Sequence, residues 1–342
     1  MKTTATEVLD RAKRSLVILF LTAGLVGCVA DYAGPDRFGI YMSTTSGENM
    51  RALIHDSLRE MNHARLSPDK SMITFTRYNV NWPDRESREE QTYDETEIMV
   101  MRRDGTGLES LVPPKKGIMA ANGYWTPDGK SVIYVSTDNP SRTPQINRID
   151  LASRQVSRVP TPGGLHVSDP HQVGEHLVFP VTDRDRKRNV LWTMGLRGGG
   201  AKQITDYSGD GGSDVAIFLG DYDPKLSPNG REVAFMRQMD KDIWHVMVSD
   251  LETGWERDLS QGFHGLELVP EWSSDGKRLI FFHVDVKDRS TWGLYTMRPD
   301  GTERAKIPLP SGYFYTMPAF FPGEGAGPNA GIIFSARKVP GL

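Results

Sequence analysis

The residues of this chain that could do chemistry do not form a known catalytic motif. The sequence contains no Gly-x-Ser-x-Gly nucleophile elbow, no His-Glu-x-x-His zinc motif and no phosphate-binding glycine loop. Its eight histidines are scattered, and Asp206, Asp210 and Asp214 do not have the spacing of a calcium-binding EF-hand loop. We therefore expect no catalytic residue, no metal ion and no cofactor.

Other polar residues recur at matching positions along the chain and could instead bind a ligand. In chain order they are His63 and Arg65, Asn122 and Tyr124, Asp169 and His171, Asp223 and Lys225, and Glu271. Polar side chains that converge on a central channel can form a ligand or ion site. The alternative is that they line a water-filled tunnel, where they only pair with one another and with solvent.

The elements that position these residues are predicted by a recurring turn. Ser/Thr-Pro-Asp/Asn-Gly, or a close variant, begins at Ser67, Thr126, Ser227 and Ser273. Proline, Asp or Asn, and glycine favour a tight turn, and the apolar cluster that follows each copy has the two-residue alternation of a strand. Each copy then continues with a second hairpin. A four-stranded antiparallel unit repeated in this way predicts the blades of a β-propeller.

The last copy, which ends with the strand Gly331–Phe334, lacks its two outer strands. The segments Ile40–Ser43 and Gly47–Leu53 match the outer strands of the preceding copy. We predict that these N-terminal strands complete the last blade and close the ring, which protects sheet edges from pairing with another chain. The predicted fold class is all-β, a six-bladed β-propeller over residues 38–337 with a short tail at 338–342.

The repeat resembles a known family. Its hairpin followed by a strand such as Leu294–Met297 and the turn Asp300-Gly301 is similar to the WD40-like (PD40) repeat of the TolB-type β-propellers. The resemblance covers about residues 38–337 and implies the propeller fold. Related repeats serve as binding platforms, peptidase accessory domains and lyase scaffolds, so the resemblance implies no single function. TolB itself has an α/β domain before its propeller, for which we expect no room here.

The N-terminus resembles the signal sequence of a bacterial lipoprotein. Basic residues precede the apolar run Leu16–Leu21, which is too short to span a bilayer. The run leads to Leu25–Cys28, which is similar to the lipobox, in which the cysteine is acylated. Cys28 is the only cysteine, so it has no disulfide partner in the chain. We predict a signal peptide at 1–27 and a tether at 28–37.

Composition and leader together predict the compartment and limit the partners. The formal net charge of the chain is −3. Because the leader is basic, the remaining chain is more acidic, with a net charge of about −5. No basic stripe remains, which argues against a nucleic-acid partner. The lipid on Cys28 would be the membrane contact. Val29 after the cysteine favours an outer-membrane lipoprotein that faces the periplasm, with exposure at the cell surface as the alternative.

Long connecting segments predict a second binding surface. The segments Tyr78–Thr96 and Asp206–Asp221 are the longest and least repetitive, and such loops commonly carry function. They should open on the face where blade connects to blade. Some of these aromatic residues could equally fold back as local packing. The candidate contact residues on this face are Trp82, Tyr93, Phe218, Phe263, Tyr313 and Phe314.

We expect a non-catalytic, monomeric propeller that binds an envelope protein or a glycan. The alternative is a lyase, because the repeats of oligogalacturonate lyases are similar. Those enzymes use histidine-rich, metal-bearing centres, and here only His171 and His63 lie near the predicted channel.

Overall fold

The computed structural model describes residues 37–78, 95–163, 165–183, 186, 188–207, 219–240, 242–327, 329–339 and 341–342. Regular structure in these residues is β-strand, apart from the short 3₁₀ helix η2 (Arg289–Thr291). The predictions for Cys28, Trp82, Tyr93 and Phe218, the signal peptide and nearly all of the tether lie outside the described residues.

Two four-stranded antiparallel sheets follow the predicted repeat. The first unit consists of β3 (Glu60–Leu66), β4 (Met72–Tyr78), β5 (Thr96–Arg102) and β6 (Glu109–Val112). The second consists of β7 (Ala120–Trp125), β8 (Ser131–Ser136), β9 (Gln145–Asp150) and β10 (Val156–Arg158).

The next three units are joined into one larger sheet. The third unit contains β11 (His166–Val167), β12 (His171–Val173), β13 (His176–Asp183), β14 (Arg188–Gly195) and β15 (Lys202–Gln203). The fourth contains β16 (Leu219–Leu226), β17 (Glu232–Asp240), β18 (Ile243–Asp250) and β19 (Glu256–Asp258). The fifth contains β20 (Leu266–Trp272), β21 (Leu279–Val284), β22 (Gly293–Met297) and β23 (Ala305–Lys306). Short parallel pairings, β14 with β16 and β18 with β20, link them.

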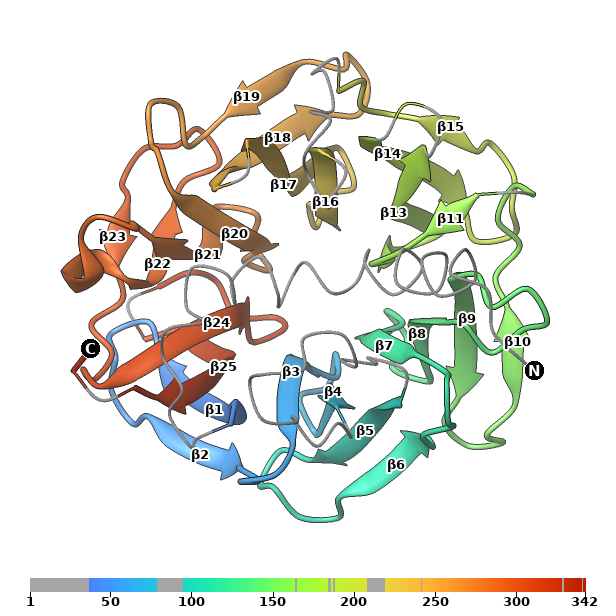
Figure 1. Ribbon diagram of the computed structural model, residues 1–342, viewed down its shortest axis with the longest axis horizontal. Coiled ribbons are helices and arrows are strands. Elements are labelled where there is room, and N and C mark those ends of the chain that lie inside the picture. The colour runs from blue at the N-terminus through green and yellow to red at the C-terminus, as the bar shows by residue number, and fades with distance from the viewer. Residues whose placement is uncertain are drawn as a thin grey trace, which may run out of the picture.

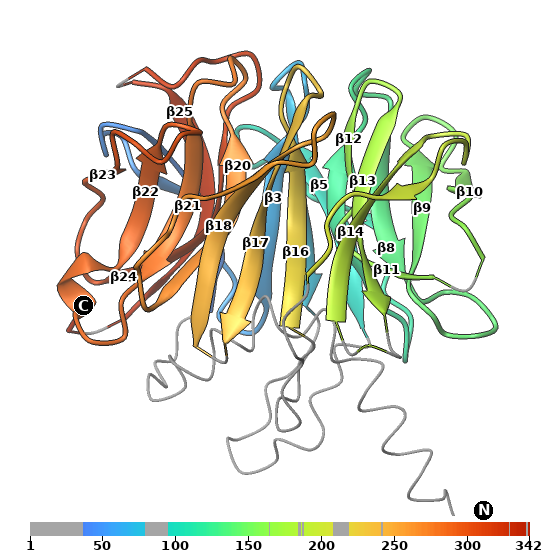
Figure 2. The same ribbon diagram turned by 90° about the horizontal axis from the view of Figure 1, so that it is seen from above.

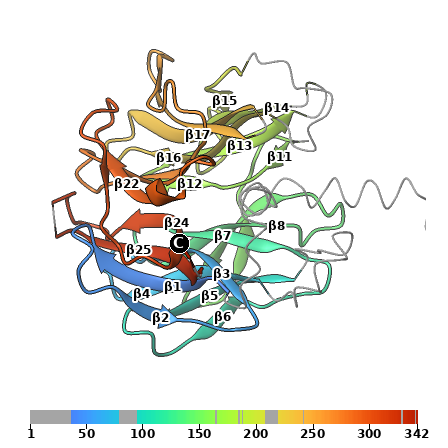
Figure 3. The ribbon, with the colours of Figure 1, turned by 60° about the vertical axis from the view of Figure 1, so that its left-hand side comes forward.

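The terminal unit combines both ends of the described chain. Its strand order is β2 (Arg51–Ile54), β1 (Gly39–Thr44), β25 (Gly331–Lys338) and β24 (Tyr313–Phe320). Strand β1 pairs antiparallel with β25, with Tyr41 opposite Phe334, so the predicted pairing of these two segments is present. Figure 3 shows the blue N-terminal strands beside the red C-terminal ones. Beyond β25 the chain is not a free tail, because Val339 is buried and its amide donates to the carbonyl of Gly312.

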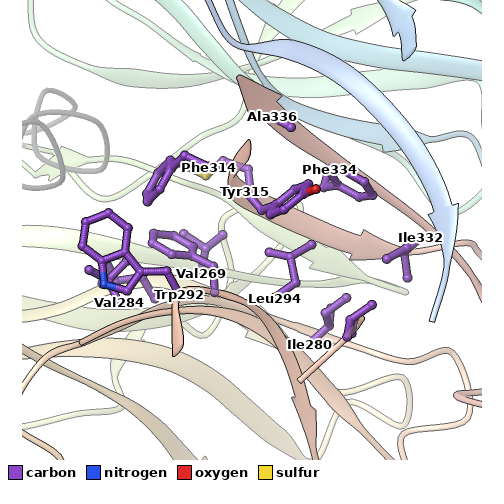
Figure 4. Packing of buried hydrophobic residues seen from close by; sticks show 14 of the residues in the cluster. Val269, Ile280, Val284, Trp292, Leu294, Phe314, Tyr315, Ile332, Phe334 and Ala336 are labelled. Carbon is purple, nitrogen blue, oxygen red and sulfur yellow. The ribbon is translucent and has the colours of Figure 1, made fainter. Parts of the chain in front are cut away.

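The units are arranged around a central axis. Figure 1, viewed along this axis, shows β3, β7, β16, β20 and β24 nearest the centre and β2, β6, β10, β19 and β23 at the rim. The inner strands run along the axis in the side view of Figure 2. Apolar side chains fill the space between neighbouring units. Figure 4 shows one such cluster, in which Trp292 and Leu294 pack near Phe314 and Phe334 of the terminal unit.

The recurring turn has a defined hydrogen-bond pattern. In the fourth unit the hydroxyl of Ser227 donates to Oδ1 of Asn229 at 2.7 Å and accepts from the amide of Glu232 at 2.9 Å. The turns at Ser67, Thr126 and Ser273 repeat this pattern. The hydroxyl thus satisfies a backbone donor at the start of the next strand, which explains the preference for Ser or Thr at this position.

Candidate functional site

The polar residues predicted from the repeat lie in the inner strands, or for Asp169 between two short inner strands, at a repeated backbone irregularity. In the first unit the register shifts between Asn62 and Arg65, and the inner strands of the second, fourth, fifth and terminal units show the same bulge. In the third unit the inner strand is interrupted at this place, between β11 and β12. One bulge residue per unit has a left-handed conformation, rare for residues other than glycine. These residues and their φ angles are His63 (59°), Asn122 (57°), Asp169 (38°), Asp223 (47°), Val269 (54°) and Met317 (52°).

Five predicted residues that lie two positions beyond the bulge come together. Nε of Arg65 lies 3.3 Å from Oε2 of Glu271, and Nη2 of Arg65 donates to the hydroxyl of Tyr124 at 3.2 Å. The Tyr124 ring also contacts the ammonium group of Lys225 at 5.1 Å and the ring of His171 at 5.4 Å. Side chains from five different units therefore form one cluster with both signs of charge.

The four polar bulge residues form a second layer next to this cluster. Nδ2 of Asn122 donates to Oδ1 of Asp169, and Nζ of Lys225 donates to Oδ1 of Asp223. Burial alone would lower the pKa of Lys225, but the carboxylate of Asp223 outweighs that effect and raises it. We call the two layers together the axial cluster.

The residues of the axial cluster, which were predicted to face a central channel, are mostly buried. His63 is 2% exposed and Lys225 is 0% exposed, and most other members are equally buried. Burial lowers the pKa of His63 to about 3, so its imidazole is neutral at pH 7. Burial and the neighbouring charge of Asp223 raise the pKa of Asp169 to about 7. Desolvation by the packed inner strands thus dominates the electrostatics at the axis.

Several polar atoms of the axial cluster have no hydrogen-bond partner among the described residues. They are both ring nitrogens of His63, Oδ1 of Asn122, Oδ2 of Asp169 and Oδ2 of Asp223. A buried polar atom without a partner costs free energy. Asn, Asp and His adopt a positive φ more readily than most residues, which gives them a conformational advantage here. Val269 and Met317 at the equivalent bulges of the fifth and terminal units show that a polar side chain is not obligatory.

The described aromatic residues on the connecting face contribute less exposed surface than predicted. Phe263 is half-buried and stacks on the ring of His283 at 4.5 Å. Tyr313 is half-buried and stacks on Tyr315. Phe314 is 3% exposed, so the prediction that it contacts a partner is wrong.

The physical reason is the position of Phe314 in a strand instead of a loop. It is the second residue of β24, where its ring packs against Phe38, Phe282 and Trp292. The alternative of local packing therefore holds for this residue.

No group of three or more His, Cys, Asp or Glu side chains suited to a metal ion occurs within the described ranges. The lyase alternative, which needs a metal near His63 or His171, therefore gains no support and stays a prediction. The described part of the chain also contains no helix long and apolar enough to cross a membrane.

One surface feature was missed by the sequence reasoning. A groove of about 680 Å³ lies between the rims of the third and fourth units, and Trp255 forms part of its wall. The only sequence signal was a tryptophan in a turn that otherwise holds polar residues and glycine.

The likeness of this chain to known proteins lies in its fold. No protein-family model matches the chain, and no curated protein matches it in sequence. TolB from Acinetobacter baumannii has 17% identity and a TM-score of 0.58, over 81% of this chain and 65% of the TolB chain. The chain thus spans about two thirds of that protein.

Two further solved structures are similar. A putative TolB from Agrobacterium tumefaciens has 13% identity and a TM-score of 0.60, over 90% of this chain and 100% of that one. A chain of a nidogen/laminin complex has 10% identity and a TM-score of 0.55, over 80% and 94% of the two chains. At these identities the likeness establishes the fold alone: this chain is an all-β protein with the architecture of the TolB-type β-propellers.

Proposed function

We propose that the chain is a closed six-bladed propeller that binds a protein or envelope component without catalysis, at the axial cluster or at the connecting face. The pairing of β1 with β25 supports closure, because it joins the first and last described strands in one sheet. Such a scaffold holds residues from several units in fixed positions around one axis.

The composition of the bulge positions is the observation that carries this proposal. Four of the six equivalent residues are polar and buried, with atoms that lack partners among the described residues, whereas the other two are Val269 and Met317. The positive φ accounts for a preference for Asn, Asp and His, but it does not require their second polar atom to lack a partner. The chain keeps these unpartnered polar atoms although they cost free energy of folding. This suggests a ligand that reaches the axial cluster when the surrounding side chains move, and that supplies the missing hydrogen bonds.

The unpartnered atoms also indicate the chemistry of the ligand. Oδ1 of Asn122 and the Oδ2 atoms of Asp169 and Asp223 are acceptors. The neutral imidazole of His63 adds one N–H donor and one acceptor nitrogen. The complementary group therefore both donates and accepts hydrogen bonds, as an amide group of a protein segment does. The proposed protein is a monomer that Cys28 anchors through lipid in the outer membrane, facing the periplasm.

His63→Met tests the proposal with little structural disturbance. It introduces the residue type of the equivalent position 317, and the described residues offer the His63 ring nitrogens no hydrogen bond to lose. We expect normal folding but loss of most partner capture when the full-length protein is crosslinked in intact cells and analysed by mass spectrometry. Asp169→Asn, which replaces an acceptor by a donor at nearly constant volume, should have the same effect.

Asp128→Asn in the turn of the second unit is the matched control. Asp128 lies on the face opposite the connecting face and is exposed, so this variant should capture partners normally. Capture at the parental level by both His63→Met and Asp169→Asn would refute the axial site.

A further inference from the structure

The groove between the rims of the third and fourth units has the features of a carbohydrate site. We infer that this rim groove binds a neutral glycan chain, with the indole of Trp255 as the stacking platform. Its volume of about 680 Å³ is in the range of small-molecule sites. The inference does not depend on the axial cluster, which lies on other strands.

Trp255 is the first element of the argument. Its side chain is 60% exposed, although it forms part of the groove wall. The guanidinium group of Arg257 lies 5.1 Å from the centre of the indole ring, and Arg257 is itself paired with Glu232. A cation over one face of a tryptophan holds the ring in place. The indole therefore offers a preorganised apolar surface to a ligand in the groove.

The turn that carries Trp255 does not need a tryptophan. The amide of Asp250 donates to the carbonyl of residue 255 at 3.0 Å, and Gly254 closes the turn by donating to the carbonyl of Asp250. The second unit builds the same turn, in which the amide of Asp150 donates to the carbonyl of Gln155 at 3.0 Å. The turn therefore forms with a polar residue, Gln155, at the position equivalent to Trp255. Its geometry does not explain why the fourth unit has an exposed indole there.

The charged residues that line the groove are Arg186, Arg188, Asp206 and Glu256, and each lies near an opposite charge. The pair of Arg186 with Asp183 is loose, with 3.9 Å between Nε and Oδ2 and an exposed guanidinium group. Nη1 of Arg188 donates to Oδ1 of Asp206 at 2.9 Å, and the carboxylate of Glu256 accepts two bonds from Arg237, at 2.6 and 3.2 Å. Paired ions of this kind present fixed donors and acceptors without a net field that favours an ion. Hydroxyl groups, which both donate and accept, are the ligand groups that match such a lining.

These observations together favour a sugar over other ligands. A pyranose has an apolar C–H face for the indole and a rim of hydroxyl groups for the ion pairs and for Gln203, which also lines the groove. A lipid chain would leave the polar wall unsatisfied. A strongly anionic ligand could pair only with the exposed Arg186, because the other charged groups of the lining already have close partners.

Trp255→Gln is the decisive variant, because glutamine is the residue that the equivalent turn of the second unit already uses. The full-length protein, in a detergent without a sugar headgroup, would be titrated calorimetrically with neutral glucose and N-acetylglucosamine oligomers. We expect binding that weakens about tenfold in Trp255→Gln, in line with the loss of one aromatic contact. Gln155→Ala in the equivalent turn should bind as the parent does.

The outcomes separate this inference from the proposed axial site. His63→Met should leave oligosaccharide binding unchanged, since it lies outside the rim groove. The inference is overturned if no neutral oligosaccharide binds at millimolar concentration, or if Trp255→Gln binds as tightly as the parent. It is equally overturned if only uronate oligomers bind, or if Trp255 mediates protein capture while the sugars do not bind.

Discussion

Asp169 and His63 lie in the same layer of the axial cluster, and burial gives them opposite effects on stability as the pH changes. The pKa of Asp169 is raised to about 7, so between about pH 4 and 7 the folded protein keeps a proton that the unfolded chain releases. Stability then falls as the pH rises through this window. The pKa of His63 is lowered to about 3, so its contribution to stability rises with pH between about 3 and 6.5.

Asp169→Asn isolates the first effect. Because asparagine does not titrate, the variant should gain stability relative to the parent as the pH rises from about 4 to 7, by at most about 1.4 kcal/mol per pH unit. The difference should be constant above about pH 7.5. Urea unfolding at a series of pH values measures it, and a difference that does not vary with pH would show that Asp169 titrates normally.

At the scale of the element, the recurring turn makes a prediction of its own. Ser227→Ala removes the hydroxyl that accepts from the amide of Glu232 and leaves this partly buried donor without that bond. We expect a loss of about 1 kcal/mol in the free energy of unfolding, measured by urea denaturation. Ser157→Ala, in the exposed outer strand β10, should change stability by less than about 0.5 kcal/mol. Equal effects of the two changes would contradict the role given to the turn hydroxyl.

The same turn explains what could be predicted from the sequence. Its residues carry local conformational preferences, so the hairpins at Thr126 and Ser227 could be located without tertiary information. The polar bulge positions were also recognised as equivalent, but their left-handed backbone was not predicted. His and Asn are enriched among residues with a positive φ, yet they adopt ordinary conformations far more often, so His63 and Asn122 give a weaker signal than glycine. The burial of these side chains at the axis depends on packing between units, which a repeat pattern does not specify.

The exposure of Phe314 and the presence of the rim groove could not be predicted, for a related reason. Phe314 was assigned to a connection, but β24 begins at Tyr313 and carries the ring into the core. The rim groove was missed because its residues come from two units, and only Trp255 was unusual within its own turn. Local sequence preferences fix strands and turns, whereas exposure is decided by neighbours distant in the chain.

At the scale of the whole molecule, Ile40 tests whether the terminal unit stabilises its neighbour. It is fully buried on β1 and belongs to a core cluster with Ile333 of β25 and with Met61 and Phe75 of the first unit. Ile40→Val removes one methylene and should cost about 1 kcal/mol, whereas Ile40→Ala should cost about 2–5 kcal/mol. If the ring is closed, hydrogen exchange should quicken in Ile40→Ala not only in β1 and β25 but also in β3 and β4. Faster exchange confined to β1 and β2 would mean that the N-terminal strands pair with the edge of an open sheet and do not stabilise the first unit.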